Sequence, residues 1–499
     1  MTPPWRLVVL FAALSAIVAS IVKLEAPYRA LITQLDRVGE TPLTVQFKRG
    51  TDPSPVVVIA HGFAGSRQLM QPFAVTLARN GYTVVSFDYL GHGRNANRLT
   101  GDITREDGAT EALVAETEKV VAYARSLHPD DGRIAILGHS MASDILVRVA
   151  QADEEIAALI AVSMFSEQVT QNTPSNLLVI VGEYEQFLTQ AALKTIGLMG
   201  VSDPNINETY VIDGVSRRVA VAPGVEHISV LYSASSLREA LTWLDRVFQR
   251  QSDGWIELRA PWLGYLFAAI IALSWPLSAW LKKIPRTAPH LTSRRFVALI
   301  GLAMLATPLA LWPLPTGTLP VLVADYLALH FLLFGVVLAV GLWRSGNLIV
   351  QLPSWHLMLQ TTLATVFVIL AIAWPLDRYV ASFVPASPDR IALVALLAFG
   401  TLSYCLADAW LTSCAGRRWW WPLLSKSALL LSLSIAVALN LRELFFLIII
   451  FPAIILFFLV YGIFSFWLFR ATEHPTVGGV ALGLAFAWAL GVTFPLVAS

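Results

Sequence analysis

The stretch that decides the fold is Arg133–Ser143, which reads Arg-Ile-Ala-Ile-Leu-Gly-His-Ser-Met-Ala-Ser. A short apolar run leads into Gly138, and Gly138 and Ala142 flank Ser140 two residues away on either side. This is the pattern of a nucleophile elbow, G-x-S-x-G, with alanine in place of the last glycine. Small residues at these positions let the chain leave a buried strand, turn sharply into a helix and expose the serine Oγ. We therefore predict a strand, a turn at Ser140 and a helix, with Ala142 tolerated because alanine is the next smallest residue.

The composition divides the chain into two parts. Of the 499 residues, 56% are hydrophobic and only 14% are charged, whereas about 25% are charged in an average soluble domain. Residues 24–258 have the mixed charges and turn residues of a globular domain, and residues 259–499 form a succession of apolar runs. Each run has roughly 18–25 residues, enough to cross the ~30 Å hydrocarbon core of a bilayer. We predict a soluble domain at 24–258 and an all-α transmembrane domain at 259–499, with about eight helices near 259–281, 296–314, 319–342, 357–375, 391–411, 424–441, 444–469 and 477–498.

A further apolar run, Trp5–Val22, is long enough to make a ninth span. Its start holds one basic residue, Arg6, and no clean small-x-small cleavage site follows it. A cleaved signal peptide has a positively charged start and such a site. We therefore expect residues 1–23 to be an uncleaved signal anchor, with a cleaved signal peptide as the alternative.

Basic residues crowd the loops on one side of the predicted spans. The opposite loops hold only scattered charges, such as Arg378 beside Asp377. Short loops rich in Lys and Arg stay in the cytoplasm. We therefore expect a multi-pass protein of a bacterial inner (cell) membrane, with a cytoplasmic N-terminus and the soluble domain on the periplasmic side. The basic residues concerned are Arg6, Lys282, Lys283, Arg286, Arg294, Arg295, Arg344, Arg417, Arg418 and Arg470.

Charge and cysteine content exclude several functional classes. The formal net charge is only +1, which argues against a nucleic-acid partner because such partners need a strongly basic surface. The two cysteines, Cys405 and Cys414, both fall in or beside a predicted span. The soluble domain therefore has no disulfide framework and no cysteine–histidine metal site. We predict no metal and no cofactor.

Within residues 24–258, strand-like and helical runs alternate, which is typical of a mainly parallel α/β sheet. The run before Ser140 is continuously apolar, as expected of a central strand that is buried on both faces. Helices are expected near 67–79, 106–127, 141–151, 187–199 and 229–249. The predicted strands are 43–47, 56–60, 83–87, 134–137, 158–162, 177–181 and 219–221.

A serine nucleophile needs a base, and histidine has a suitable pKa near neutrality. On folds with this elbow the chain order is serine, carboxylate, histidine. His227 is the one histidine between Ser140 and the first long apolar run after it, and it follows the last predicted strand. Glu185, in the loop after the preceding strand, is our choice for the acid, with Glu183 as its rival and Asp213 as a weaker third.

An oxyanion hole would complete the site, because negative charge develops on the substrate's carbonyl oxygen. One donor is expected to be the backbone N–H of Met141, directly after the nucleophile. The second is expected from the loop His61-Gly62-Phe63-Ala64-Gly65-Ser66, with the N–H of Phe63 as the donor. Ser66 is expected to cap the helix that follows this loop.

Four segments together carry a family resemblance: His61-Gly62-Phe63, Asp88-Tyr89-Leu90-Gly91-His92-Gly93-Arg94, Gly138-His139-Ser140-Met141-Ala142 and the later His227. Over about residues 43–249 the chain resembles the α/β-hydrolase superfamily, and most of all its serine aminopeptidase S33 and monoacylglycerol-lipase-like branch. The resemblance implies Ser140 as nucleophile, Glu185 as acid, His227 as base, and Phe63 with Met141 as oxyanion donors. It also implies that Asp88 and His92 are structural. The apolar C-terminal half has no part in it.

The chain departs from many of these relatives in one respect. They insert a helical lid between two of the strands, but here the connection is only Ser163–Asn176, too short for a lid domain. Met164 and Phe165 begin this connection and are expected to supply an apolar wall. A site without a lid beside a membrane favours a lipid-like acyl ester as substrate, although small soluble esters remain an alternative.

The predicted spans contain few polar residues: Asp325, His330, Asp408 and Asn440. We expect only His330 near mid-span, which is too sparse for a proton or ion pathway. The main hypothesis is therefore a membrane-anchored serine hydrolase acting on an ester, thioester or amide. An acyltransferase with the same triad is one alternative. A membrane transporter or sensor whose hydrolase-like domain only binds a ligand is the other.

Overall fold

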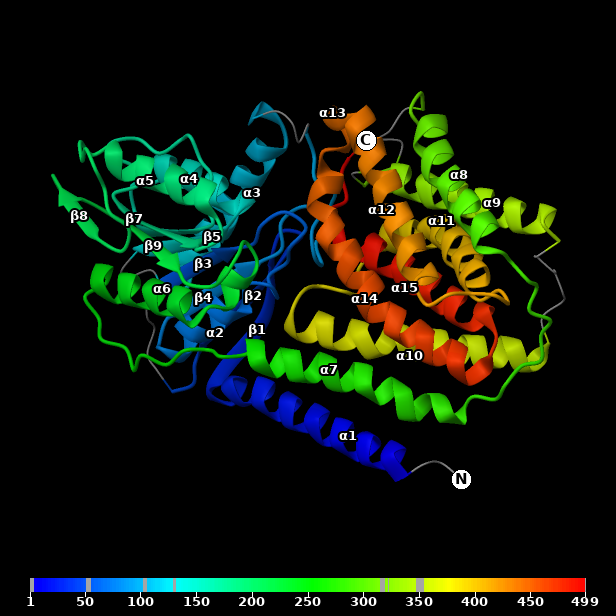
Figure 1. The fold of residues 1–499 in the computed structure, drawn as a ribbon. Helices are drawn as coiled ribbons and strands as arrows, with labels where there is room; N and C mark the ends of the chain where they lie inside the picture. The colour runs from blue at the N-terminus through cyan, green and yellow to red at the C-terminus, as the bar shows by residue number, and fades with distance from the viewer. Residues whose placement is uncertain are drawn as a thin grey trace.

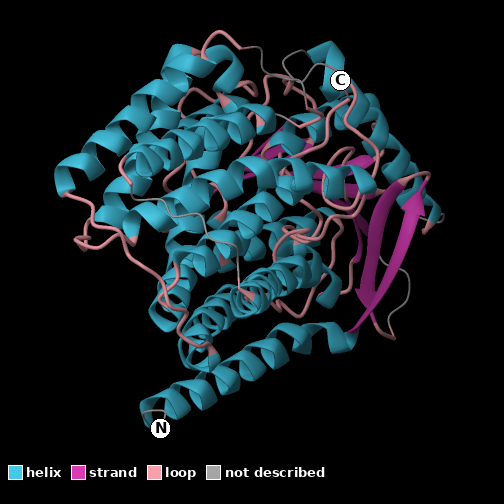
Figure 2. Cartoon of the chain, turned by 90° about the vertical axis from the view of Figure 1, so that its right-hand side faces the viewer, coloured by secondary structure: helices cyan, strands magenta, loops and turns pink. Residues whose placement is uncertain are grey.

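The computed structural model describes residues 4–50, 55–101, 106–128, 132–314, 319–321, 323–346 and 354–498. Residues 1–3 of the predicted signal anchor, residue 322 of the predicted 319–342 run and residue 499 of the predicted transmembrane domain lie outside them. Figure 1 shows two parts side by side, and Figure 2 looks onto the helical part, with strands behind its helices and at the right. We call residues 26–259 the sheet half. The helix at residues 4–25 and the chain from residue 260 onward form the helical half.

The sheet half is built on a nine-stranded sheet with the order β1-β2-β4-β3-β5-β6-β7-β9-β8. Its central strands run parallel, and β1, β2 and β8 are antiparallel to their neighbours. The β5 strand, which leads into Ser140, lies between β3 and β6. The strands are β1 (Leu31–Val38), β2 (Thr41–Lys48), β3 (Val56–Ala60), β4 (Thr83–Phe87), β5 (Ile134–His139), β6 (Ile156–Val162), β7 (Asn176–Gly182), β8 (Thr209–Ile212) and β9 (Val215–Ala222).

Helices cover both faces of the sheet, which explains why its central strands are apolar throughout (Figure 1). Successive strand residues point to opposite faces, so Val58 joins one core cluster and Val57 the other. Each face is closed by its own set of helices. The first face packs α3 (Glu111–Ser126), α4 (Met141–Ala152) and α5 (Gln186–Gly197), and the second packs α2 (Gln71–Arg79) and α6 (Ala234–Val247).

The predicted mostly parallel α/β sheet is confirmed, and all seven predicted strands are present. Two edge strands, β1 and β8, were not expected from the sequence. The prediction that Ser66 caps a helix is wrong: α2 begins only at Gln71, with Met70 at its N-cap. The Ser66 hydroxyl instead accepts a hydrogen bond from the backbone N–H of Ser382, in the helical half.

Nine helices in the described part of the chain are long and apolar enough to cross a membrane. One is N-terminal, and the other eight match the eight predicted runs. In Figure 1 the N-terminal helix lies beside α7. The helices are α1 (Pro4–Glu25), α7 (Ala260–Leu277), α8 (Ser293–Leu311), α9 (Ala324–Arg344), α10 (Trp355–Tyr379), α11 (Pro388–Thr412), α12 (Trp421–Leu439), α14 (Phe446–Thr472) and α15 (Pro475–Thr493), with the short α13 (Leu441–Leu444) before α14.

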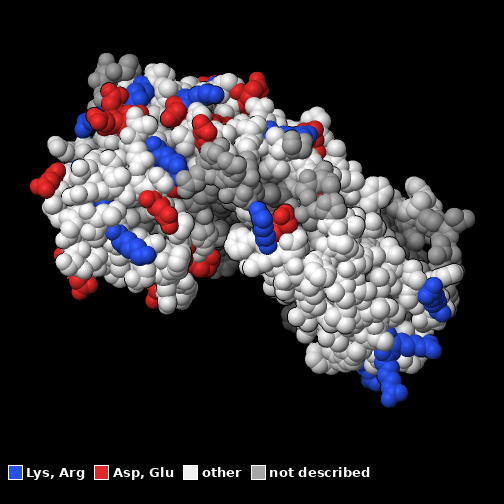
Figure 3. Space-filling model, turned by 90° about the horizontal axis from the view of Figure 1, so that it is seen from above, with Lys and Arg blue, Asp and Glu red and all other residues white. Residues whose placement is uncertain are grey.

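Charged residues are distributed differently over the two halves. On the face in Figure 3, acidic and basic residues mix over the sheet half, whereas Lys and Arg gather at the end of the helical half far from the sheet. Loops at this far end are tied together by Lys283, which pairs with Glu473 at 2.5 Å, and by Arg286, which donates to the carbonyls of Ser413 and Glu473. The N-terminus lies at the same end (Figure 1).

The two halves meet along the loop at residues 88–99 of the sheet half. Buried Arg390, in the first turn of α11, donates to the Gly91 carbonyl at 2.8 Å. The segment after α15 pairs with the same loop: Leu496 donates to the Gly91 carbonyl at 2.9 Å and accepts from the Leu99 N–H at 2.8 Å. An ion pair between Arg94 and Asp377 at 2.6 Å adds to the junction. The helical half thus holds a loop that belongs to the sheet half.

Candidate active site

Ser140 lies at a strained turn between β5 and α4. Its φ of +54° and ψ of −118° are rare for a residue with a side chain, and such strain costs about 1–3 kcal/mol unless the surroundings impose it. A Cβ at Gly138 would lie 2.6 Å from Leu146 Cδ1 and 3.0 Å from Ala142 Cβ, so a larger residue there would have to displace its neighbours. Ala142 itself is fully buried against this glycine. The turn therefore has the geometry of a nucleophile elbow, with alanine accommodated.

Three side chains from three separate segments form one hydrogen-bonded chain at this turn. The Ser140 Oγ lies 2.9 Å from His227 Nε2, and His227 Nδ1 lies 2.6 Å from Glu185 Oε1. This arrangement suits an imidazole whose Nδ1–H donates to the carboxylate and whose Nε2 accepts from the serine hydroxyl. The structure thus brings together the predicted serine, histidine and first-choice acid.

Glu185 is nearly buried and is held by three donors. Its Oε2 accepts the Gly182 N–H and the Ser163 hydroxyl, each at 2.7 Å, while Oε1 faces His227. Burial by itself would raise the pKa of Glu185, but the hydrogen bonds from His227, Gly182 and Ser163 outweigh it and hold the pKa below its usual value. Glu185 is therefore an anion at neutral pH.

The two other predicted acids do not contact the imidazole. Glu183 accepts the Gly224 N–H at 2.6 Å through its Oε2. Asp213 lies in the turn between β8 and β9 with a φ of +50°. Of the three candidates, the structure brings only Glu185 to His227.

Two further residues contact the hydrogen-bonded Ser140–His227–Glu185 side chains, and neither contact was predicted from the sequence. His139 is buried beside Ser140, and its Nε2 donates to the His227 carbonyl at 2.8 Å. Burial, together with the nearby His227, lowers the pKa of His139 to about 3, so it is neutral. Ser163 fixes Glu185. His139 could have been noticed because it lies inside the elbow motif, directly before Ser140. The role of Ser163 could not, because it depends on how the chain packs around Glu185.

The predicted oxyanion loop lies directly against the elbow. A Cβ at Gly62 would lie 3.0 Å from His139 Nδ1 and 3.1 Å from Ser140 Cβ, so the absence of a side chain allows this approach. Phe63 follows Gly62, and Met141 is the first residue of α4. The first N–H groups of a helix have no partner within it, which leaves the Met141 N–H available to an incoming oxygen.

A buried polar network supports this loop from behind. Asp88 accepts from the N–H groups of Arg67 at 2.7 Å and Arg94 at 3.1 Å. His61 donates through Nδ1 to the Gly62 carbonyl and accepts the Tyr89 N–H on Nε2. Burial lowers the pKa of His61 to about 4, so the imidazole is neutral.

His92 belongs to the same network. It lies edge-on to the Phe63 ring, with the ring centroids 5.9 Å apart. Its Nδ1 lies 2.8 Å from the Leu90 carbonyl oxygen, and burial lowers its pKa to about 3. These contacts suit the structural role expected of Asp88 and His92.

Ser140 and His227 face a cavity of about 800 Å³, within the usual size range of ligand sites. Much of its lining is apolar, and Phe165 from the short connection after β6 is part of it, as predicted for this wall. Its companion Met164 is buried in the core instead. Phe446, from α14 of the helical half, also lines the cavity. Sequence reasoning could not find this contribution, because it depends on how the two halves pack.

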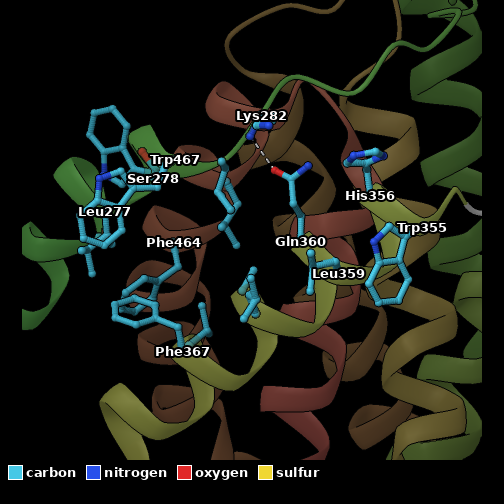
Figure 4. Close-up of a pocket in the computed structure, with 17 residues that line it drawn as sticks. Leu277, Ser278, Lys282, Trp355, His356, Leu359, Gln360, Phe367, Phe464 and Trp467 are labelled. Carbon is cyan, nitrogen blue, oxygen red and sulfur yellow. Dashed lines mark hydrogen bonds between the residues drawn. The ribbon is translucent and has the colours of Figure 1, made fainter. Parts of the chain in front are cut away.

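A second cavity of about 550 Å³ lies in the helical half among α7, α10 and α14. Figure 4 shows its rings and aliphatic side chains, with the Gln360 side chain accepting the Lys282 N–H at 2.7 Å. It contains none of the predicted site residues. In the described part of the chain, no group of three or more His, Cys, Asp or Glu side chains could hold a metal ion.

The mostly parallel sheet with helices on both faces and a sharp turn at Ser140 give the sheet half the α/β-hydrolase fold. The sequence model of the family "Serine aminopeptidase, S33" matches residues 51–221, so this part of the chain is similar to that family of hydrolases. The match includes Ser140 and Glu185 and ends before His227.

Among curated proteins, the chain is similar to an uncharacterized 31.7 kDa protein in the traX-finO intergenic region of Escherichia coli. The two are 23% identical over 179 residues, which is 35% of this chain and 57% of the relative. A second protein of the same description is 22% identical over the same shares. The chain thus spans little more than half the length of these relatives.

Among solved structures, the chain is similar to a predicted CIB-like hydrolase from Thermoplasma acidophilum, at 17% identity and a TM-score of 0.34. That match covers 44% of this chain and 98% of the other. It is also similar to a soluble variant of monoglyceride lipase from Saccharomyces cerevisiae, at 13% identity and a TM-score of 0.32. That match covers 43% of this chain and 95% of the lipase.

Proposed function

We propose that the protein is a membrane-anchored serine hydrolase that cleaves acyl esters through a Ser140–His227–Glu185 triad. The observation that carries the proposal is the hydrogen-bonded chain from Ser140 Oγ through His227 to Glu185, which faces a cavity of about 800 Å³. Nucleophile, base and orienting acid in this relation are the general signature of nucleophilic acyl transfer.

The proposed reaction has two steps. The Ser140 Oγ attacks the ester carbonyl while His227 Nε2 takes the hydroxyl proton, and the N–H groups of Phe63 and Met141 stabilise the negative oxygen. The C–O bond to the alcohol then breaks, His227 returns the proton to the leaving oxygen, and an acyl-enzyme remains. Water repeats the sequence and releases the acid. Glu185 stays ionised throughout and stabilises the imidazolium.

A lipid-like acyl ester is the favoured substrate, ahead of thioesters and amides. The apolar lining of the cavity and the short connection between β6 and β7 support this preference. An acyltransferase remains the alternative within the same chemistry, since it differs only in replacing water with another acceptor. The transporter or sensor hypothesis loses support, because a domain that only binds a ligand has no need of an intact hydrogen-bonded triad.

Labelling with a fluorophosphonate probe in isolated membranes tests the proposal. Wild type should be labelled, Ser140→Ala should not, and Ser143→Ala serves as the matched control because its hydroxyl only bonds the Ser140 carbonyl. If wild type fails to react, or if Ser140→Ala reacts equally, the enzyme is not a serine hydrolase.

We further propose a bacterial inner membrane as the location, with the sheet half on the periplasmic side. The clustering of basic residues at the end of the helical half far from the sheet supports this orientation, because loops rich in Lys and Arg stay in the cytoplasm. Both native cysteines are buried, so single surface cysteines can report the topology. A membrane-impermeant maleimide should label exposed Glu154→Cys when only the outer membrane is permeable. Exposed Arg418→Cys should react only after the inner membrane is opened, and the reverse pattern would exclude this orientation.

A further inference from the structure

The helical half contributes one side chain to the wall of the active-site cavity. Phe446 begins α14, and its ring lies 5.2 Å from that of Phe63, centroid to centroid, at an interplanar angle of 33°. Both rings line the cavity that contains Ser140. Because Phe63 carries a proposed oxyanion N–H, Phe446 lies beside the position that the acyl group of a substrate would take.

The lining of this cavity combines apolar and polar side chains. The oxyanion loop, the 88–99 loop and α3 contribute the apolar side chains of Phe63, Leu99 and Leu113, and α14 adds Phe446. α4 and the connection after β6 contribute the polar side chains, which include the Asp144–Arg148 ion pair, Ser166 and Gln168, together with apolar Ile145 and Phe165. Such a mixed lining suits an ester that joins an acyl chain to a polar alcohol.

The apolar wall continues onto the outside of α14. Phe445 and Ile448, on either side of Phe446 in the sequence, are 52% and 45% exposed. Ile448 lies in a helix that is apolar enough to cross a membrane, and Phe445 directly precedes that helix. The two exposed side chains therefore place an apolar surface beside Phe446 at the start of α14.

Resting on the proposed function, we propose that α14 completes an acyl-binding subsite for the long-chain ester of a membrane lipid. The acyl chain lies against Phe63 and Phe446, and Phe446 determines which chain lengths are accepted. The membrane helix thereby adds Phe446 to the wall that Phe165 of the short connection supplies.

Hydrolysis of p-nitrophenyl acetate, butyrate, octanoate and laurate by the purified full-length protein tests the proposal. Phe446→Ala should lower kcat/KM for the laurate about tenfold or more, because each lost methylene contact in an apolar site discriminates by about this factor. The acetate should change less than about twofold, since it does not reach the ring. Phe446→Trp should shift the preference toward shorter chains.

Phe466→Ala is the matched control, because it removes an exposed ring of the same helix that does not line the cavity. Its ratio of laurate to acetate hydrolysis should equal that of wild type. An unchanged ratio in Phe446→Ala, or the same change in Phe466→Ala, overturns the subsite while fluorophosphonate labelling of Ser140 persists. Failure of wild type to label overturns the proposed function and the subsite with it.

Discussion

The sheet half and the helical half differ in one group of buried polar side chains. In the sheet half, buried Asp88, His61, His139 and Glu185 lie together around the turn at Ser140, whereas other buried polar side chains such as Arg217 lie elsewhere. In the helical half they are spread along the helices, and the charged ones lie near the helix ends. Asp408, near the far end of α11, bonds the Ser425 hydroxyl and the Lys426 ammonium.

This difference separates two tasks. Isolated buried charges are costly, so a chain keeps them where they perform chemistry or join segments. In the sheet half Glu185 belongs to the hydrogen-bonded chain at Ser140. In the helical half Arg390 lies at the junction and bonds a loop of the other half. The helical half is therefore more than an anchor, because it fixes part of the active-site surroundings.

The sharpest test of the reactive cluster compares two glutamates in one loop. Glu185→Gln should lower kcat by about three to four orders of magnitude, because an amide does not stabilise the imidazolium and can hold the wrong tautomer. Glu183→Gln should keep activity within about threefold, since an amide oxygen still accepts the Gly224 N–H. Ester hydrolysis by the two purified variants measures this. A larger loss in Glu183→Gln would reassign the acid.

Three buried histidines near the site should also make the stability of the sheet half fall at acidic pH. Burial lowers the pKa values of His61, His92 and His139 to about 4, 3 and 3, from an ordinary 6.5. The unfolded chain therefore binds more protons than the folded one below pH 6.5. Stability is fully present above that pH and is lost as the pH falls toward the folded values.

At pH 5.5, one unit below 6.5, each buried histidine should lower the free energy of unfolding by about 1.4 kcal/mol, and the three together by about 4 kcal/mol. Thermal unfolding of the full-length protein at several pH values in this range measures how steeply the stability falls with pH. His92→Gln should reduce this dependence of stability on pH by about a third, because glutamine takes up no proton. An unchanged dependence would contradict the conclusion that His92 is buried in its neutral form.

At the junction, Arg390→Ala should lower the stability of the protein by about 1–3 kcal/mol. The guanidinium donates to the carbonyls of Gly91, Gly491 and Phe494, and all three would lose a charged donor. The thermal midpoint and the rate of fluorophosphonate labelling should fall together, since the 88–99 loop borders the cavity. Arg418→Ala, at the exposed far end, is the control and should change neither. If the thermal midpoint falls but the rate of labelling does not change, Arg390 stabilises the protein without affecting the site at Ser140.

Local patterns were enough to predict most of the sheet half. Short apolar runs and motif spacing predict the Ser140 turn, the parallel strands and the order serine, glutamate, histidine. The edge strand β1 was not predicted, because most of its residues are exposed and its sequence shows no clear alternation. The role of Ser66 and the presence of Phe446 in the cavity depend on contacts between segments more than 300 residues apart. No local pattern encodes such contacts.

The pairing of Leu496 with the loop that holds Gly91 and Leu99 has a consequence for biosynthesis. Chains fold as they emerge, the N-terminal parts first, so this loop is made long before its partner. Leu496 follows every apolar helix in the sequence and reaches Leu99 only after α15 is in place. Leu99 lines the active-site cavity. In the membrane location that we propose, the cavity is therefore finished only when insertion of the helices has run to its end, and a half-inserted chain lacks part of its lining.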